Sequence, residues 1–201
     1  MLEQRQMITP VDEKYDIFFD VINRFLGLFS MEAQQESQND PATEYPFVAM
    51  DTRQVFDQIQ FVSQYLWEQE EGGVDRLYSF IDIGCGIGNV LLFAEQFGFD
   101  VHGIEKDPNP CQVAVRLFGK ERILAEDVFS FQRYGHFDVV YYFRPLADKE
   151  QQIRFEQLVE QGMRPGALLV ANGKYSALDG NPAFIRLHET LPVWQKASAQ
   201  S

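Results

Sequence analysis

The chain has 201 residues, of which 45% are hydrophobic and 14% aromatic, a composition that suits one globular domain of fair size. Its formal net charge of −13 opposes binding to phosphate backbones, so a nucleic acid is an unfavourable partner. Two separated cysteines and three scattered histidines disfavour a disulfide scaffold, and we expect no metal site.

The first 50 residues form a helical extension and a linker. Residues 12–29 predict a helix, because apolar side chains recur at steps of three and four. Its wide, Phe-rich stripe suits either a lid that packs on the main domain or a partner surface, including a homodimer. Acidic side chains on its polar face disfavour a membrane-surface helix. Residues 30–46 are polar and predict a linker, so the main domain is expected over residues 51–201.

The main domain alternates strands and helices. A helix at about 51–70, capped by Asp51 or Thr52, comes first. Strands follow at 77–83, 100–105, 121–127, 137–143 and 166–172, and helices at 88–97, 110–119 and 149–162. Strands joined by crossover helices predict an α/β fold, a doubly wound, mostly parallel Rossmann-like sheet with helices on both faces. Residues 184–197 predict a closing antiparallel hairpin.

Three glycines occur where the first strand turns into its helix, in the stretch FIDIGCGIGNV at 80–90. Ligands of such sheets bind outside the carboxyl ends of the strands. Gly84 and Gly86 permit a close approach that a Cβ would prevent, and Gly88 permits tight packing at the helix start. The dinucleotide pattern GxGxxG fails because its sixth position is Asn89, which speaks against a nicotinamide-dependent oxidoreductase.

The stretch from Asp82 to Gly88 reads Asp-x-Gly-x-Gly-x-Gly. It resembles the first motif of the S-adenosylmethionine-dependent methyltransferases with a Rossmann-like fold (class I). Glu105 ends the second strand about 20 positions after Gly84, where a carboxylate can accept hydrogen bonds from ribose hydroxyls. The resemblance implies that Asp127, with Val128 beside it, meets the adenine, and that the end of strand 137–143 faces the transferable methyl.

The resemblance covers about residues 55–172. It implies S-adenosyl-L-methionine as the cofactor, with these candidate cofactor-binding residues: Asp82, Gly84, Cys85, Gly86, Gly88, Asn89, Glu105, Asp127, Val128 and Tyr141.

The sequence departs from some branches of this family after the fourth strand. Phe143-Arg144-Pro145-Leu146 stands where enzymes that methylate base amines have Asn/Asp-Pro-Pro-aromatic. The Asn-Asn-Phe motif of the non-SET histone-lysine enzymes is missing too. Little chain follows the fifth strand, so a substrate cap must come mainly from residues 1–50. We expect an enzyme, a methyltransferase for a small molecule or protein side chain; the alternative is a methyltransferase-like cofactor-binding or interaction module without turnover.

The catalytic residues remain open, with Tyr142 and Arg144 as candidates. A sulfonium is already a good leaving group, so alignment in a dry pocket is the main task. Tyr141 and Tyr142 are adjacent in a strand, so at most one can face the site. Arg144 suits a substrate carboxylate or phosphate, or a surface ion pair with Asp148. Without a leader or an apolar run of ~20 residues, the chain is expected to be cytoplasmic, without a membrane span.

Overall fold

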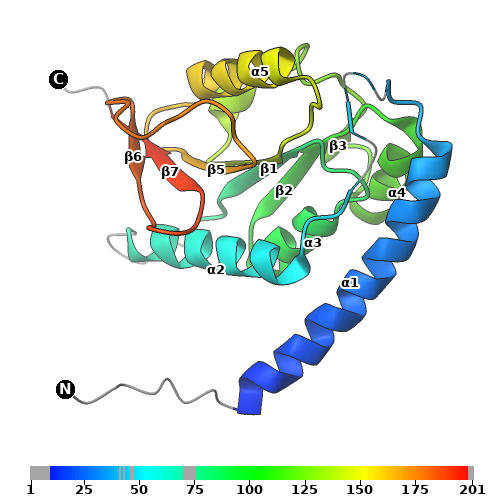
Figure 1. Cartoon of the computed structure of the whole chain (residues 1–201). Helices are drawn as coiled ribbons and strands as arrows, with labels where there is room; N and C mark the ends of the chain where they lie inside the picture. Colours follow the sequence, from blue (N-terminus) through cyan, green and yellow to red (C-terminus); the bar gives the residue numbers. More distant parts are fainter. Residues whose placement is uncertain (1–9, 41, 43, 46–47, 70–75, 199–201) are drawn as a thin grey trace.

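The computed structural model describes residues 10–40, 42, 44–45, 48–69 and 76–198. Its strands are β1 (Ser79–Ile83), β2 (Asp100–Ile104), β3 (Ile123–Leu124), β4 (Val139–Phe143), β5 (Leu168–Asn172), β6 (Phe184–Arg186) and β7 (Val193–Lys196). They form a seven-stranded sheet of order β3-β2-β1-β4-β5-β7-β6 (Figure 1). The first five strands run parallel, and β7 pairs antiparallel with both β5 and β6. The doubly wound sheet and the closing hairpin are therefore confirmed.

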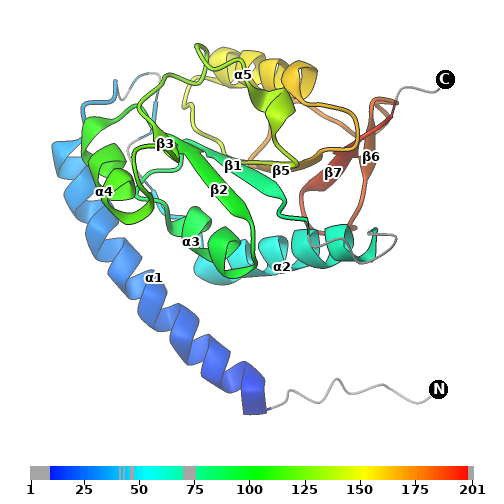
Figure 2. The same ribbon diagram turned by 180° about the vertical axis from the view of Figure 1, so that it is seen from behind.

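Helices cover both faces of the sheet. One face carries α2 (Thr52–Glu68), α3 (Asn89–Gln96) and α4 (Pro108–Phe118), and the other carries α5 (Lys149–Gly162), as Figures 1 and 2 show from opposite sides. Two buried clusters fill the two interfaces. Because successive strand residues point to opposite faces, Phe80 packs with the first cluster and Ile81 with the second.

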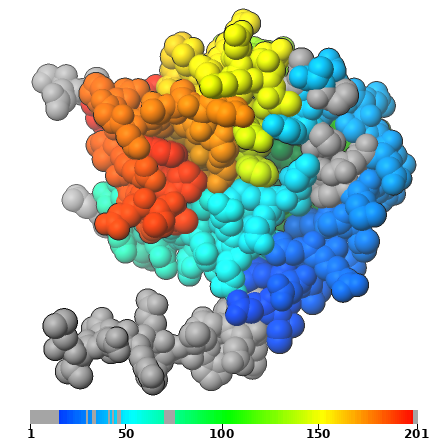
Figure 3. Space-filling model, in the orientation of Figure 1, coloured from blue at the N-terminus to red at the C-terminus, as the bar shows by residue number. Residues whose placement is uncertain are grey.

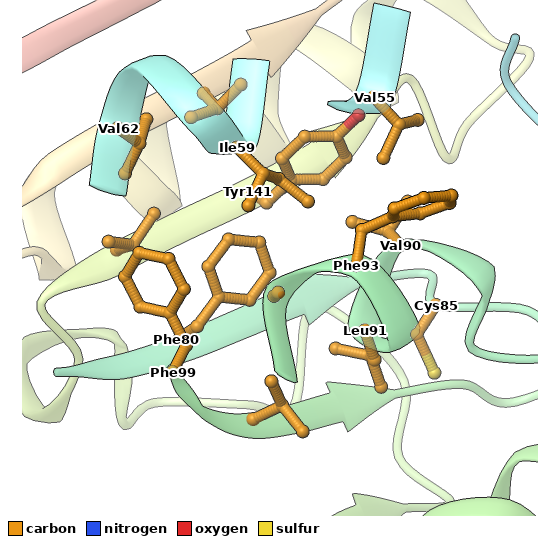
Figure 4. Packing of buried hydrophobic residues seen from close by; sticks show 14 of the residues in the cluster. Val55, Ile59, Val62, Phe80, Cys85, Val90, Leu91, Phe93, Phe99 and Tyr141 are labelled. Carbon is orange, nitrogen blue, oxygen red and sulfur yellow. The ribbon is translucent and has the colours of Figure 1, made fainter. Parts of the chain in front are cut away.

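The cluster under α2 shows why this helix forms part of the main domain. Val55, Ile59 and Val62 recur at helical spacing and are almost completely buried. Figure 4 shows them facing Tyr141 and Phe80 from the sheet. The helix starts as expected, because the Asp51 carboxylate accepts hydrogen bonds from the first amide groups of α2.

The helix α1 (Pro10–Glu36) is longer than the sequence predicted. Residues 30–36, predicted as linker, continue the helix. Glu, Ala and Gln dominate this stretch and are good helix formers. A polar composition therefore did not indicate a loop here. α1 contacts the start of α2 through Phe19, whose ring lies 5.2 Å from that of Phe56. The Asn23 side chain also accepts a hydrogen bond from the Thr52 amide.

Among the described residues, no helix combines the length and apolar character needed to span a bilayer.

Candidate functional site

A cavity of about 260 Å³ opens at the carboxyl ends of β1, β2 and β4. Four of the predicted cofactor-binding residues line it: Gly84, Glu105, Asp127 and Val128. Arg144, a predicted catalytic candidate, lines it as well. The sheet brings these residues together from the loops after β1, β2, β3 and β4, as parallel topology requires.

The glycine loop after β1 has a backbone that other residues rarely adopt. Gly84, Gly86 and Gly88 have φ angles of +76°, +55° and +89°. A Cβ on Gly84 would lie 3.2 Å from the Pro145 side chain, so the loop approaches the segment after β4 closely. A Cβ on Gly88 would lie 2.4 Å from the Phe118 ring, which confines this position to glycine. Bare backbone is therefore required here by both conformation and packing.

Glu105 connects the glycine loop to the end of β2. Its carboxylate accepts hydrogen bonds from the Gly86 amide at 2.9 Å and from the Asp107 amide at 2.7 Å. Burial raises the pKa of Glu105, although these hydrogen bonds oppose the shift. Each carboxylate oxygen keeps a lone pair after accepting one bond, so Glu105 can still accept from a ligand hydroxyl.

Asp82 and Cys85 lie beneath the loop and outside the cavity lining. Asp82 is buried, and burial, with the nearby Glu105 charge second, raises its pKa well above the ordinary value. Burial likewise raises the pKa of the Cys85 thiol well above its usual range, so this thiol is a poor nucleophile. Asn89 is the first residue of α3 and also lies outside the lining.

Lys106 links two acidic residues of the cavity lining. Its ammonium forms ion pairs with Glu44 and, at 3.4 Å, with Asp127. Burial alone would lower the pKa of Lys106, but the two acids outweigh burial and raise it. Asp127 also accepts a hydrogen bond from the Phe129 amide at 2.9 Å, which fixes its direction. In the part of the chain that the structure describes, no group of three or more His, Cys, Asp or Glu side chains could hold a metal ion.

Described residues of the segment between α1 and α2 line one side of the cavity. Asn39, Glu44, Tyr45 and Val48 line the cavity. The Ser37 hydroxyl donates to the Asp107 carboxylate at 2.7 Å, which anchors the segment at the start of α4. The sequence analysis missed these individual residues, because a polar segment without periodicity carries no signal of what it contacts.

Arg144 lies between two tyrosine rings at the end of the cavity next to β4. Its guanidinium donates to the Tyr45 hydroxyl at 2.9 Å and to the Tyr175 hydroxyl at 3.3 Å. The same guanidinium carbon lies 5.0 and 5.6 Å from the two ring centroids. Asp148 instead caps α5, and no carboxylate among the described residues forms an ion pair with Arg144. Arg144 also has a φ of +25°, a strained conformation for a side-chain-bearing residue.

The two adjacent tyrosines of β4 point to opposite faces of the sheet, as predicted. Tyr141 is buried beneath α2, where its hydroxyl lies 3.1 Å from the Met50 sulfur. Tyr142 is buried beneath α5, with its ring 5.2 Å from that of Phe155. Burial raises the pKa of both phenols well above the ordinary value. Neither tyrosine lines the cavity, so Arg144 is the only catalytic candidate of the two proposed from sequence that does.

No protein-family model and no curated protein matches the sequence. Solved structures with a similar chain include the plantazolicin methyltransferase BpumL in complex with SAH (19% identity, TM-score 0.48, covering 60% of this chain and 46% of that one). An amino pentose methyltransferase from Micromonospora echinaspora with bound SAM is 18% identical (TM-score 0.48, covering 67% and 61%). A sugar N-methyltransferase from Streptoalloteichus is 20% identical (TM-score 0.46, covering 72% and 60%). The chain spans between 46% and 61% of the length of these three proteins.

Proposed function

We propose that this protein is an S-adenosylmethionine-dependent methyltransferase that acts on a small molecule or a protein side chain. One observation carries the proposal. The Asp-x-Gly-x-Gly-x-Gly loop exposes backbone at the cavity, and the Glu105 carboxylate, hydrogen-bonded to that loop, lines the same cavity. An acid beside bare backbone at the carboxyl end of a parallel sheet suits the ribose of a nucleoside ligand.

The cavity lining offers a matching group for each part of an adenosyl ligand. Glu105 would accept from the ribose hydroxyls, and Asp127 would accept from the exocyclic amine of the adenine. Val128 and Ile104 supply apolar surface for the ring. Gly86 and Gly88 belong to the glycine loop, Asn89 starts the helix after it, and buried Asp82 and Cys85 would support it from beneath. None of these five residues lines the cavity, and neither does Tyr141 beneath α2.

When bound, the cofactor would supply an activated methyl group on a sulfonium. The chain's own residues then need to bind, orient and exclude water. Both β4 phenols are buried, and burial raises their pKa well above the ordinary value. They therefore stay protonated near neutral pH, and neither can act as a base. Arg144 is the cation at the end of the cavity next to β4, where we expect the methyl acceptor, and its neighbouring hydroxyls and ring faces hold it in place. We propose that it positions an anionic group of the methyl acceptor, a carboxylate or a phosphate, by paired hydrogen bonds.

A thermal-shift screen with S-adenosylmethionine, S-adenosylhomocysteine, NAD and NADP tests the proposal. A ligand that binds only the folded protein stabilises it by about 2.7 kcal/mol at 100 times its Kd. For a chain of this size we expect a rise of roughly 5–10 °C with the two adenosyl compounds. No response to them, or a response to NAD or NADP instead, would contradict the assignment.

A binding module without turnover is the second candidate, favoured by the exposed apolar side chains of α1. Such a module would show the same thermal shift. It would produce no S-adenosylhomocysteine from S-adenosylmethionine with any acceptor in a substrate screen, whereas the enzyme would do so with its own acceptor.

A further inference from the structure

The helix α1 has two different apolar faces. One face contacts the main domain through Phe19 and Leu26, which are 2% and 8% exposed. The other face points away from the domain and carries six large apolar residues that are 45–66% exposed: Ile17, Phe18, Val21, Phe25, Leu28 and Phe29. We call these six residues the α1 stripe. At 100° per residue, the centre of the stripe lies about 130° around the helix from the centre of the buried face.

The α1 stripe is large for a surface without a partner. The six residues together expose roughly 700 Å², whereas a large apolar patch on a monomer is ~300–600 Å². Each partner in a standard protein interface contributes ~800 Å². The exposed surface of the stripe therefore approaches what one partner contributes to a stable interface. Figure 3 shows α1 on the outside of the molecule, along one flank.

The spacing of the stripe matches that of a helix pairing with its own copy. Phe18, Val21, Phe25 and Leu28 follow steps of three, four and three, the a and d positions of a heptad. In an antiparallel pair centred at residue 23, Val21 meets Phe25 of the copy and Phe18 meets Leu28. Each such pair would join a larger and a smaller side chain, a combination that favours close packing across the seam.

We propose that two copies of this chain form a homodimer through the α1 stripe, with the two helices antiparallel. The stripe residues project away from α2 and α4, so the docked face of α1 stays on its own domain. The pairing does not depend on the proposed chemistry. It does bear on the cavity, because the end of α1 is fixed next to it: the Asn109 amide group donates to the Glu36 carbonyl at 2.7 Å. Immobilising α1 would therefore also hold the cavity wall that follows it.

The test is the mass of the full chain in solution by sedimentation equilibrium, from 1 to 100 µM. The 23.2 kDa chain should sediment with twice that mass. Phe25→Glu and, separately, Leu28→Glu should shift the mass to that of one chain, while the circular dichroism spectrum stays close to that of the parent. Their Tm should fall only to the value that the parent approaches on dilution, because dimerisation stabilises the folded state by mass action. Both side chains are more than half exposed, so neither change removes a core contact.

Ile185→Glu is the matched control. Ile185 is 53% exposed on β6, at the opposite edge of the sheet from α1, and this variant should remain dimeric. A parent chain that is monomeric at 100 µM would overturn the proposal, and so would a dimer that only Ile185→Glu dissociates. A monomer that instead binds vesicles containing anionic lipid would show that the stripe serves a membrane and would overturn it too.

Discussion

Replacing Glu105 is the perturbation for which the structure gives the clearest expectation. The carboxylate is hydrogen-bonded to two backbone amides and lines the cavity. A hydrogen bond to a charged group contributes about 1.5–3 kcal/mol. Glu105→Ala removes the proposed ribose contacts, so we expect cofactor binding to weaken by about 1–3 kcal/mol. That loss corresponds to a roughly 5- to 150-fold increase in Kd.

Glu105→Gln should not restore binding. Its amide keeps one acceptor oxygen but places an NH₂ group against a backbone N–H, at either Gly86 or Asp107. Calorimetric titration with S-adenosylhomocysteine measures both variants. Glu95→Gln is the matched control, because it removes one charge from an exposed ion pair with Arg122, away from the cavity. A folded Glu105→Ala protein with the Kd of the parent would refute the reasoning.

Three further predictions concern the same region. Gly88→Ala should destabilise the protein by ~1–3 kcal/mol in urea titration, because its methyl would collide with Phe118 and φ stays positive; an unchanged midpoint would contradict this. Burial raises the pKa of Asp82 in the folded protein, so the free energy of unfolding falls as pH rises above the pKa of the unfolded chain. Asp82→Asn should therefore raise Tm at pH 8, and this gain should vanish below about pH 4, where the carboxyl is protonated in both states. Arg144→Gln should change the Kd of S-adenosylhomocysteine less than twofold, whereas a tenfold loss would place the cofactor's own carboxylate on Arg144.

The sequence predicts the sheet well because each strand is a short apolar run between turn residues. The third strand is the exception. It is paired only over Ile123–Leu124, so Glu126 and Asp127 lie in the loop that follows and not in the strand. The same loop places Asp127 and Val128 in the cavity lining, and their contact with an adenine stays a prediction.

The rest of the site depends on contacts between residues far apart in the chain, which local patterns do not encode. Lys106 pairs with Glu44, 62 positions away, and Arg144 contacts Tyr45, 99 positions away. Composition shows a polar segment before residue 50 but not which side chains reach the cavity. The depth of Tyr142 beneath α5 was equally hidden, because the alternation of a strand leaves open which of its faces meets a ligand.

A crystal structure of the protein with S-adenosylhomocysteine tests the central claim most directly. We expect the adenosyl group to lie across the backbone at Gly84, with both ribose hydroxyls within hydrogen-bonding distance of Glu105 and the adenine beside Asp127 and Val128. A cavity that stays empty at saturating ligand, or a ligand bound elsewhere on the protein, would contradict the account.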